Sequence, residues 1–221
     1  MKTLILGDIH AEFGKLNTII DNKNPDLVIC CGDFGYWPKV ETLPQFEDIK
    51  PKNSKILWID GNHENHWALK DRKSDEIVPN VIYMPRGSTY DLPDGRRILF
   101  MGGADSIDKN YRKLGIDWFP EEVITQKDIY NLPDTKIDIL ISHTCSNEIR
   151  DEKMIKLNPL KLKDPSNDAL SYIWNKYRPK LWFFGHWHRF SQGSYKGTLW
   201  WCLSYPDEGS RWWFWLPEKR K

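Results

Sequence analysis

Groups that bind metals or transfer protons recur directly after apolar runs of this sequence. Gly61-Asn62-His63-Glu64 follows one such run, Ile56-Leu57-Trp58-Ile59. It joins an amide oxygen, a hard neutral ligand, to an imidazole that transfers protons near neutral pH. The same placement recurs at Gly7-Asp8-Ile9-His10, Gly32-Asp33, Ser142-His143 and Gly185-His186-Trp187-His188. Because open α/β sheets place ligands at the carboxyl ends of their strands, we expect these groups to converge on one crevice.

The collected donors are imidazoles and oxygen groups, without a thiolate: Asp8, His10, Asp33, Asn62, His143, His186 and His188. Such a set suits manganese, iron, zinc or nickel better than calcium. The set exceeds what one ion takes from protein while a position stays open for substrate, so two divalent ions that share a carboxylate are predicted. Two ions about 3.5–4 Å apart form a clamp for in-line displacement at phosphorus, which favours phosphoester hydrolysis.

In order and spacing these groups resemble the calcineurin-like metallophosphoesterase superfamily, over roughly residues 2 to 203. The resemblance implies that one ion is held by Asp8, His10, Asp33 and His188. It implies that the other ion is held by Asp33, Asn62, His143 and His186, so that Asp33 bridges the two. It also implies a metal-bridging hydroxide as nucleophile, and His63 as the catalytic group that contacts phosphate and protonates the leaving oxygen. Manganese is the metal that we expect first.

The sequence departs from the serine/threonine protein phosphatase branch, which carries Asp-Arg-Gly shortly after the second aspartate. Here Phe34-Gly35-Tyr36-Trp37 follows Asp33, and the last motif is Gly-His-x-His, as in branches with many phosphodiesterases and small-molecule phosphatases. We therefore expect a hydrolase of phosphomonoesters or phosphodiesters. A nuclease or nucleotide phosphodiesterase is one alternative. A catalytically silent protein-interaction scaffold of the same fold is another, against which His63 beside an intact ligand set argues.

Cations that contact the substrate must come from another segment of the chain. The stretch 102–112 begins with two glycines, which let backbone approach a ligand closely, and it offers Lys109 and Arg112. Arg86 and Arg189 are the next candidates. The alternative for this stretch is an ordered turn with solvated charges.

Three further side chains near these motifs have two interpretations each. Tyr36 and Trp37 follow Asp33 and are expected either in the core or as an apolar wall that faces the substrate. His66 is expected at the surface or at a helix start.

Composition and charge bear on the expected partners and compartment. Lys plus Arg (32) nearly balance Asp plus Glu (31), so no global field attracts polyanions, and long nucleic acid is not favoured although it is not excluded. No apolar run has the length of a membrane span or a signal peptide, so we expect a cytoplasmic protein without membrane contact. The four cysteines lack paired metal spacing, and disulfides are not expected.

The pattern of apolar residues predicts one α/β metallophosphoesterase domain over residues 1–221. Continuous apolar runs predict buried strands at 3–6, 27–31, 55–59, 137–141 and 181–184. Helices are predicted over 13–20, 65–70 and 165–177, with a weak helix over 40–49 and a helical stretch from 120 towards 130. A hairpin region over 81–101 and aromatic strands at 197–203 and 211–216 complete the set.

This element order implies two facing mixed β-sheets flanked by helices, a four-layer αββα sandwich. Five tryptophans crowd the end of the chain: Trp200, Trp201, Trp212, Trp213 and Trp215. We expect them to pack against a sheet or to form the interface of a homo-oligomer.

Overall fold

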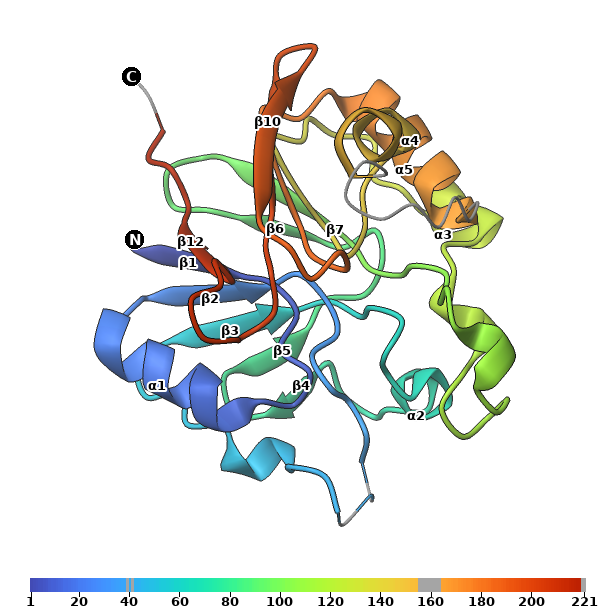
Figure 1. Ribbon diagram of the computed structural model, residues 1–221. Helices are drawn as coiled ribbons and strands as arrows, with labels where there is room; N and C mark the ends of the chain where they lie inside the picture. Colours follow the sequence, from blue (N-terminus) through green and yellow to red (C-terminus); the bar gives the residue numbers. More distant parts are fainter. Residues whose placement is uncertain (39, 41, 155–163, 220–221) are drawn as a thin grey trace.

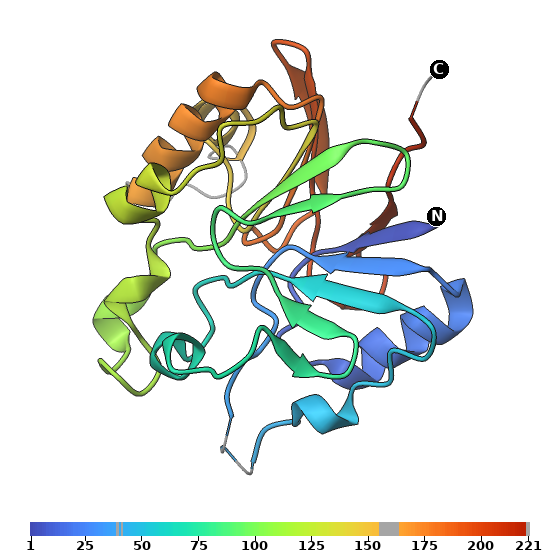
Figure 2. The same ribbon diagram turned by 180° about the vertical axis from the view of Figure 1, so that it is seen from behind.

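The computed structural model describes residues 1–38, 40, 42–154 and 164–219. Two six-stranded sheets face each other, and helices cover their outer faces (Figures 1 and 2). The first sheet contains β12 (Trp213–Trp215), β1 (Thr3–Leu6), β2 (Leu27–Cys30), β3 (Lys55–Trp58), β5 (Val81–Tyr83) and β4 (Glu76–Val78), in that order. The second contains β10 (Ser191–Tyr195), β11 (Thr198–Cys202), β9 (Leu181–Phe184), β8 (Ile139–Ser142), β7 (Arg97–Met101) and β6 (Thr89–Asp91). The predicted four-layer arrangement is confirmed.

The helical elements are short apart from α1 and α5. They are α1 (Phe13–Lys23), η1 (Phe46–Asp48), α2 (His66–Lys70), η2 (Lys109–Tyr111), η3 (Pro120–Glu122), α3 (Gln126–Tyr130), α4 (Asn147–Ile149), η4 (Arg150–Met154) and α5 (Pro165–Tyr177). In Figure 1, α1 lies beneath the first sheet, whereas α4 and α5 lie on the far side of the second sheet.

Parallel pairing at the centre of both sheets directs the strand ends to one side. β1, β2, β3 and β5 pair in parallel in the first sheet, and β7, β8, β9 and β11 do so in the second. The antiparallel strands β12, β4, β6 and β10 lie at the edges. The loops that leave the carboxyl ends of the central strands therefore share one edge of each sheet.

Alternation along the strands divides the core into three apolar layers. Leu4 and Leu6 of β1 pack in the layer beneath the first sheet with α1, whereas Ile5 points between the sheets. The outer layer of the second sheet contains Trp182 of β9 and Leu170 of α5. Two buried sides per sheet explain why the central strands read as unbroken apolar runs.

Two predicted helices were wrong in extent. Only η1 forms in the segment 40–49, of which residue 41 lies outside the described residues. The stretch from 120 to 130 is divided into η3 and α3, because Val123 is extended at ψ 141° and Thr125 starts α3 anew in a capping box with Asp128. Strands β4 and β10 were not predicted. β10 is polar and β4 has three residues, so neither carries a clear apolar pattern.

The tryptophans near the end of the chain pack in both sheets, as predicted: Trp200 and Trp201 lie in β11 of the second sheet, and Trp213 and Trp215 in β12 of the first. β12 pairs antiparallel with β1, with Trp213 and Trp215 over the layer that contains α1 and Phe214 between the sheets. The homo-oligomer interface at this end stays a prediction. All four cysteines are buried free thiols. Across the described residues, no helix combines the length and apolarity that a bilayer crossing requires.

Candidate active site

Every predicted donor lies in a loop that leaves a central strand. Asp8 and His10 follow β1, Asp33 follows β2, Asn62 follows β3, His143 follows β8, and His186 and His188 follow β9. Four of these residues have positive φ although none is glycine: His10 (48°), Asp33 (43°), His186 (69°) and His188 (49°). Such conformations cost about 1–3 kcal/mol each and persist where the surroundings over-determine them, often at functional sites.

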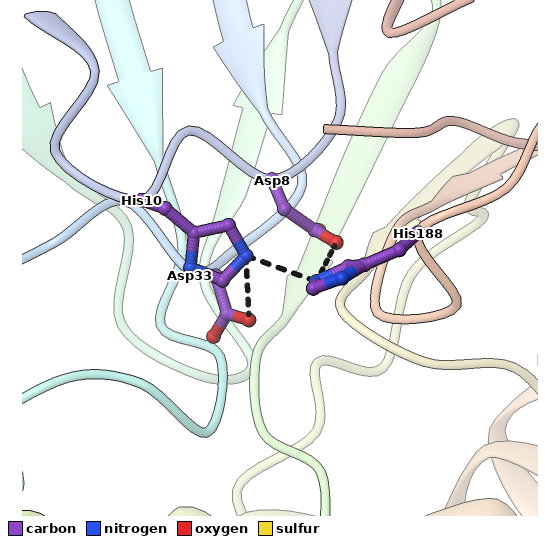
Figure 3. Close-up of side chains that lie close together, drawn as sticks. All are labelled: Asp8, His10, Asp33 and His188. Carbon is purple, nitrogen blue, oxygen red and sulfur yellow. Dashed lines mark hydrogen bonds and ion pairs between the residues drawn. The ribbon is translucent and has the colours of Figure 1, made fainter. Parts of the chain in front are cut away.

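The first donor group is compact and half open to solvent. Ligand atoms of Asp8, His10, Asp33 and His188 all lie within 4.8 Å of one another (Figure 3). The Nε2 atoms of His10 and His188 are 3.0 Å apart. Nε2 of His10 is 3.6 Å from Oδ2 of Asp33, and Nε2 of His188 is 3.5 Å from Oδ2 of Asp8.

The second donor group adjoins the first, with Asn62 and His143 buried and His186 half-buried. Oδ1 of Asn62 lies 3.0 Å from Nε2 of His143 and 3.0 Å from Nδ1 of His186. Nε2 of His143 is also 3.4 Å from Oδ1 of Asp33. Asp33 thus directs one carboxylate oxygen to each group, the geometry that a bridging ligand needs.

The protonation of this cluster suits cations. Burial lowers the pKa of His10, His186 and His188 below the usual range, which leaves their ring nitrogens neutral with lone pairs to offer. Burial raises the pKa of Asp8 to about 7. Burial opposes ionisation of Asp33 too, but His143 and His63 hold the pKa of Asp33 well below its usual value. Burial opposes the charged form of His143, but Asp33 outweighs it and raises the pKa of His143 to about 10. Neutral imidazoles and carboxylates that converge around one protonated ring fit divalent ions, whose binding would displace that proton.

Neighbouring backbone groups orient the ligands. Nδ1 of His143 is 2.9 Å from the carbonyl oxygen of Cys31, so Nδ1 carries a proton and Nε2 is the ring atom turned towards the donor group as a ligand. The backbone N–H of His186 donates to both oxygens of Asp8, at 3.0 and 2.9 Å. Gly185 is required there, because a Cβ at this position would overlap the Asp8 carboxylate.

Glu64 ties two ligand loops together, a role that the sequence did not reveal. Its carboxylate is fully buried and accepts hydrogen bonds from the backbone N–H of Gly35 (3.0 Å) and of Gly61 (2.6 Å). One oxygen thus holds the loop after Asp33 and the other holds the loop before Asn62. Burial, reinforced by the charge of Asp33, raises the pKa of Glu64 to about 8.

His63 lies beside the donor cluster. Its backbone N–H donates to Oδ1 of Asp33 at 2.9 Å, and its ring centroid is 5.2 Å from that of His10. On its other side, Nε2 of His63 is 3.0 Å from Nη2 of Arg112. Burial lowers the pKa of His63, Asp33 opposes this shift, and Arg112 reinforces it.

A hollow of about 500 Å³ opens next to His63. It is lined by Asp33, Asn62, His63, Asp105, Ser106, Ile107, Asp108, Lys109, Asn110, Arg112, Arg150, Asp164, Asn167, His186, Trp187 and His188. Both predicted cations therefore reach it. Lys109 is paired with both oxygens of Asp105 (2.9 and 2.6 Å), and Arg112 is paired with Oδ1 of Asp108 (2.8 Å). The segment 102–122, which we name the pocket wall, contributes seven of the lining residues, Asp105 to Asn110 and Arg112.

A second hollow of about 370 Å³ lies against the open donor group. It is lined by Ile9, His10, Glu12, Lys15, His188, Tyr205, Pro206 and Asp207. The ring of Tyr205 lies 4.8 Å from that of His188, which lines both hollows. The donor cluster thus borders two hollows.

Tyr36 does not lie where a substrate wall requires. It is 7% exposed and packs against Phe46 and Trp58, so this part of the prediction was wrong and its core alternative applies. The indole Nε1 of Trp37 donates to the carbonyl oxygen of His63 at 2.8 Å, so Trp37 supports the His63 loop and is not among the residues that line either hollow.

Two other side chains lie deeper than expected. His66 begins α2, as predicted, but it is buried, with Nε2 3.1 Å from the carbonyl oxygen of Gly61. Arg86 binds Oδ2 of Asp60 through Nε (3.0 Å) and Nη2 (2.7 Å). The Arg86 guanidinium also donates to the carbonyl oxygens of Glu121, Glu122 and Val123. Arg86 therefore anchors the pocket wall and does not face a substrate.

The sequence matches the calcineurin-like phosphoesterases over residues 1–190. The chain belongs to this family. It is 23% identical to the human lariat debranching enzyme, over 85% of this chain and 42% of that protein. It is also 23% identical to the CWF19-like protein 1 homolog of Drosophila melanogaster, over 82% of this chain and 34% of that protein. The chain thus spans less than half the length of these relatives.

Among solved structures, this calcineurin-like phosphoesterase is similar to an archaeal phosphodiesterase. The two share 16% identity, with 98% of this chain and 99% of that chain covered and a TM-score of 0.42. The family supports phosphoesterase activity with divalent metals, and the cluster of Asp8, His10, Asp33 and His188 is a metal-binding candidate in this chain.

Proposed function

We propose that the protein hydrolyses phosphoesters with a dinuclear metal centre. The observation that carries this proposal is the convergence of two donor groups on Asp33, whose two oxygens are directed to His10 in one group and His143 in the other. One ion is assigned to Asp8, His10, Asp33 and His188, and the other to Asp33, Asn62, His143 and His186. When bound, the two ions supply an activated water and neutralise charge on the phosphoryl oxygens. Manganese is the metal that we propose first.

His63 and Arg112 form the proton-transfer and phosphate-binding pair of this proposal. Arg112 has donors but no acceptor, so its 3.0 Å contact with Nε2 of His63 requires a lone pair on that nitrogen. A non-bridging phosphate oxygen is a stronger acceptor for the guanidinium. Substrate that takes over Arg112 releases Nε2 of His63, which would then take up a proton from solvent water and pass it to the leaving oxygen.

The presence of two hollows beside the donor cluster favours a phosphodiester over a phosphomonoester as the substrate. With His63 as the acid, the leaving alcohol lies in the hollow next to His63 and Arg112. A diester has a second alcohol group. The second hollow, at Tyr205, could hold it, because that hollow lies against the same donor cluster and His188 lines both hollows. A monoester carries a free oxygen there and leaves that hollow unfilled. The similarity to a lariat debranching enzyme supports the same choice, although it extends over 42% of that protein.

A series of esters with one leaving group tests both parts of the proposal. p-Nitrophenyl phosphate, methyl p-nitrophenyl phosphate and thymidine 5′-(p-nitrophenyl phosphate) differ only in the retained group. With manganese present, we expect chelator-sensitive release of p-nitrophenol, with kcat/KM rising from the monoester to the nucleoside diester. Tyr205→Ala is expected to lower the diester to monoester ratio of kcat/KM, and Tyr205→Phe to keep it.

The outcomes separate the hypotheses. If the protein binds two ions but hydrolyses no ester of the series in a chelator-sensitive way, the result supports the protein-interaction scaffold and overturns the proposed enzymatic activity. Hydrolysis that does not depend on the retained group overturns only the diester preference. Oligonucleotides added to the panel decide between a nuclease and a small-molecule phosphodiesterase.

A further inference from the structure

We propose that Ser106 and Glu122 are positioning residues that fix the amide of Asn62 and thereby set the affinity of one of the two ions. The inference rests on the proposed function, because it takes Asn62 as a ligand of the ion shared with His143 and His186. Both residues belong to the pocket wall and lie outside the motifs that identify the family. Hydrogen-bond donation runs in one direction, from Asn62 through Ser106 to Glu122.

A chain of hydrogen bonds reaches Asn62 from behind. Nδ2 of Asn62 donates to Oγ of Ser106 at 3.0 Å. Oγ of Ser106 donates to Oε2 of Glu122 at 2.9 Å, and the backbone N–H of Ser106 donates to Oε1 of Glu122 at 2.6 Å. Asn62 is 5% exposed, Ser106 2% and Glu122 0%, so water does not compete for these bonds.

This chain decides which end of the amide faces the ions. Above its pKa, which burial raises to about 7, the carboxylate of Glu122 only accepts, so the single proton of the Ser106 hydroxyl is committed to it. The remaining lone pairs of Oγ need a donor, and only the NH₂ end of Asn62 supplies one. Oδ1 of Asn62 must then point the opposite way, to Nε2 of His143 and Nδ1 of His186. Without the hydroxyl, the amide loses the contact that distinguishes its two orientations, and a flipped amide offers N–H groups to a cation.

Glu122 is itself held from two sides. Nε1 of Trp118 donates to its Oε1 at 3.1 Å, and Nη2 of Arg86 donates to its backbone carbonyl oxygen at 3.0 Å. The pocket wall that carries Lys109 and Arg112 between Ser106 and Glu122 is therefore fastened to a metal ligand at one end and to the buried Arg86 at the other. The position of the wall and the affinity of that ion are coupled.

The test is a manganese titration of the metal-free protein without substrate, followed by calorimetry and by electron paramagnetic resonance. The parent is expected to bind two ions. Ser106→Ala is expected to weaken one ion by roughly 10- to 100-fold, the usual loss when an outer hydrogen-bond partner of a ligand is removed, and to leave the other within about twofold. Glu122→Gln is expected to weaken the same ion by less, because an amide still fills the site but offers Ser106 one acceptor in place of two.

Ser146→Ala is the matched control. Ser146 is also buried, and its Oγ has no hydrogen-bond partner among the described residues. It is expected to bind both ions as the parent does. Equal affinities in Ser106→Ala and the parent overturn the inference, and so does an equal weakening of both ions, which indicates a general loosening of the fold. A parent that binds one ion overturns the dinuclear centre instead. Should Ser106→Ala fail to fold, Glu122→Gln against Ser146→Ala decides the question.

Discussion

The donor cluster and the pocket wall meet at His63 but are built in different ways. The donors are each placed by the end of a central strand, and the loops that carry them are short. The pocket wall runs from Gly102 to Glu122 with only the short elements η2 and η3. It is held by discrete contacts: Ser106 with Glu122, Lys109 with Asp105, and Arg112 with Asp108.

The difference separates what each region controls. Strand ends share the rigidity of a sheet buried on both faces, so the cluster can hold donors in strained backbone conformations and keep a fixed geometry for ions. The wall is anchored at its two ends and bears exposed side chains between them, including Tyr111 (93%) and Ile116 (64%). Changes in the cluster, or at Ser106 and Glu122 that fasten the wall to Asn62, should therefore alter metal binding, whereas changes in the wall between these two residues should alter substrate selectivity with both ions retained.

The largest effect is expected at Asp33, which belongs to both donor groups. Asp33→Asn removes the charge that both groups share and replaces one carboxylate oxygen by an N–H donor. Loss of a residue that only hydrogen-bonds to a metal ligand lowers activity by up to about 100-fold. Because Asp33 is itself a ligand in both groups, the loss of kcat/KM should exceed that value. Elemental analysis should find less than one ion per chain. Near-normal turnover with two ions bound would show that Asp33 is not the bridge.

His63 lies where the donor cluster meets the pocket wall, and its removal should affect hydrolysis without affecting metal binding. His63→Ala should slow hydrolysis by roughly 10²- to 10⁴-fold, as loss of a general acid does, and leave two ions bound. The loss should shrink for esters with good leaving groups, which need little protonation. Equal losses for p-nitrophenyl and alkyl esters would assign His63 to phosphate binding instead.

The two regions also differ in how much of them the sequence predicts. The donors were predictable because each follows a continuous apolar run, the pattern of a strand that is buried on both faces. The carboxyl ends of such parallel strands lie together at one edge of the sheet. The wall was not, because its anchors depend on contacts distant in sequence. From the sequence, Arg86 was a further candidate for contact with the substrate, whereas in the structure Asp60 and the carbonyl oxygens of η3 surround it.

The same limit explains the wrong place expected for Tyr36 and the missed role of Ser106. Directly after Asp33, Tyr36 is close to the site in sequence, yet its ring turns into the aromatic cluster with Phe46 and Trp58. Ser106 has no distinguishing pattern, and its partner Glu122 is 16 residues away. Side-chain direction in loops follows from tertiary packing, which neither spacing nor residue type records.

Loosening the anchor of the wall should destabilise the fold next. Arg86→Met leaves the buried Asp60 carboxylate unpaired and is expected to cost about 3–5 kcal/mol in the free energy of unfolding, measured with urea. Burial opposes ionisation of Asp60, but Arg86 outweighs it and keeps the pKa below the usual value. The pair thus contributes fully above about pH 4, and the difference from the parent should shrink below that pH.

The matched control for Arg86→Met is the exposed pair of Lys52 with Asp21, whose side chains are 60% and 48% exposed. Lys52→Met should change the free energy of unfolding by less than about 1 kcal/mol. The double variant Asp60→Asn/Arg86→Met should recover part of the loss, because it removes the unpaired charge. If Arg86→Met were no more harmful than Lys52→Met, the wall would have another anchor.

The smallest effects are expected at the two cations of the wall, and they should be unequal. Arg112 touches Nε2 of His63 and its side chain is 10% exposed, whereas the Lys109 ammonium is 41% exposed and occupied by both oxygens of Asp105. A charge-assisted contact with phosphate contributes about 1.5–3 kcal/mol, so Arg112→Ala should lower kcat/KM by roughly 10- to 150-fold with both ions retained. Lys109→Ala should lower kcat/KM by less and act through KM, because the ammonium must first leave Asp105.

Arg112→Lys is the sharper probe: it keeps the charge but loses the planar guanidinium, so it should restore binding only in part. Parent-like kinetics in Arg112→Ala on every ester of the series would show that the wall is only structural. Phosphate recognition would then be expected at Arg150, the remaining cation among the described residues that line the hollow.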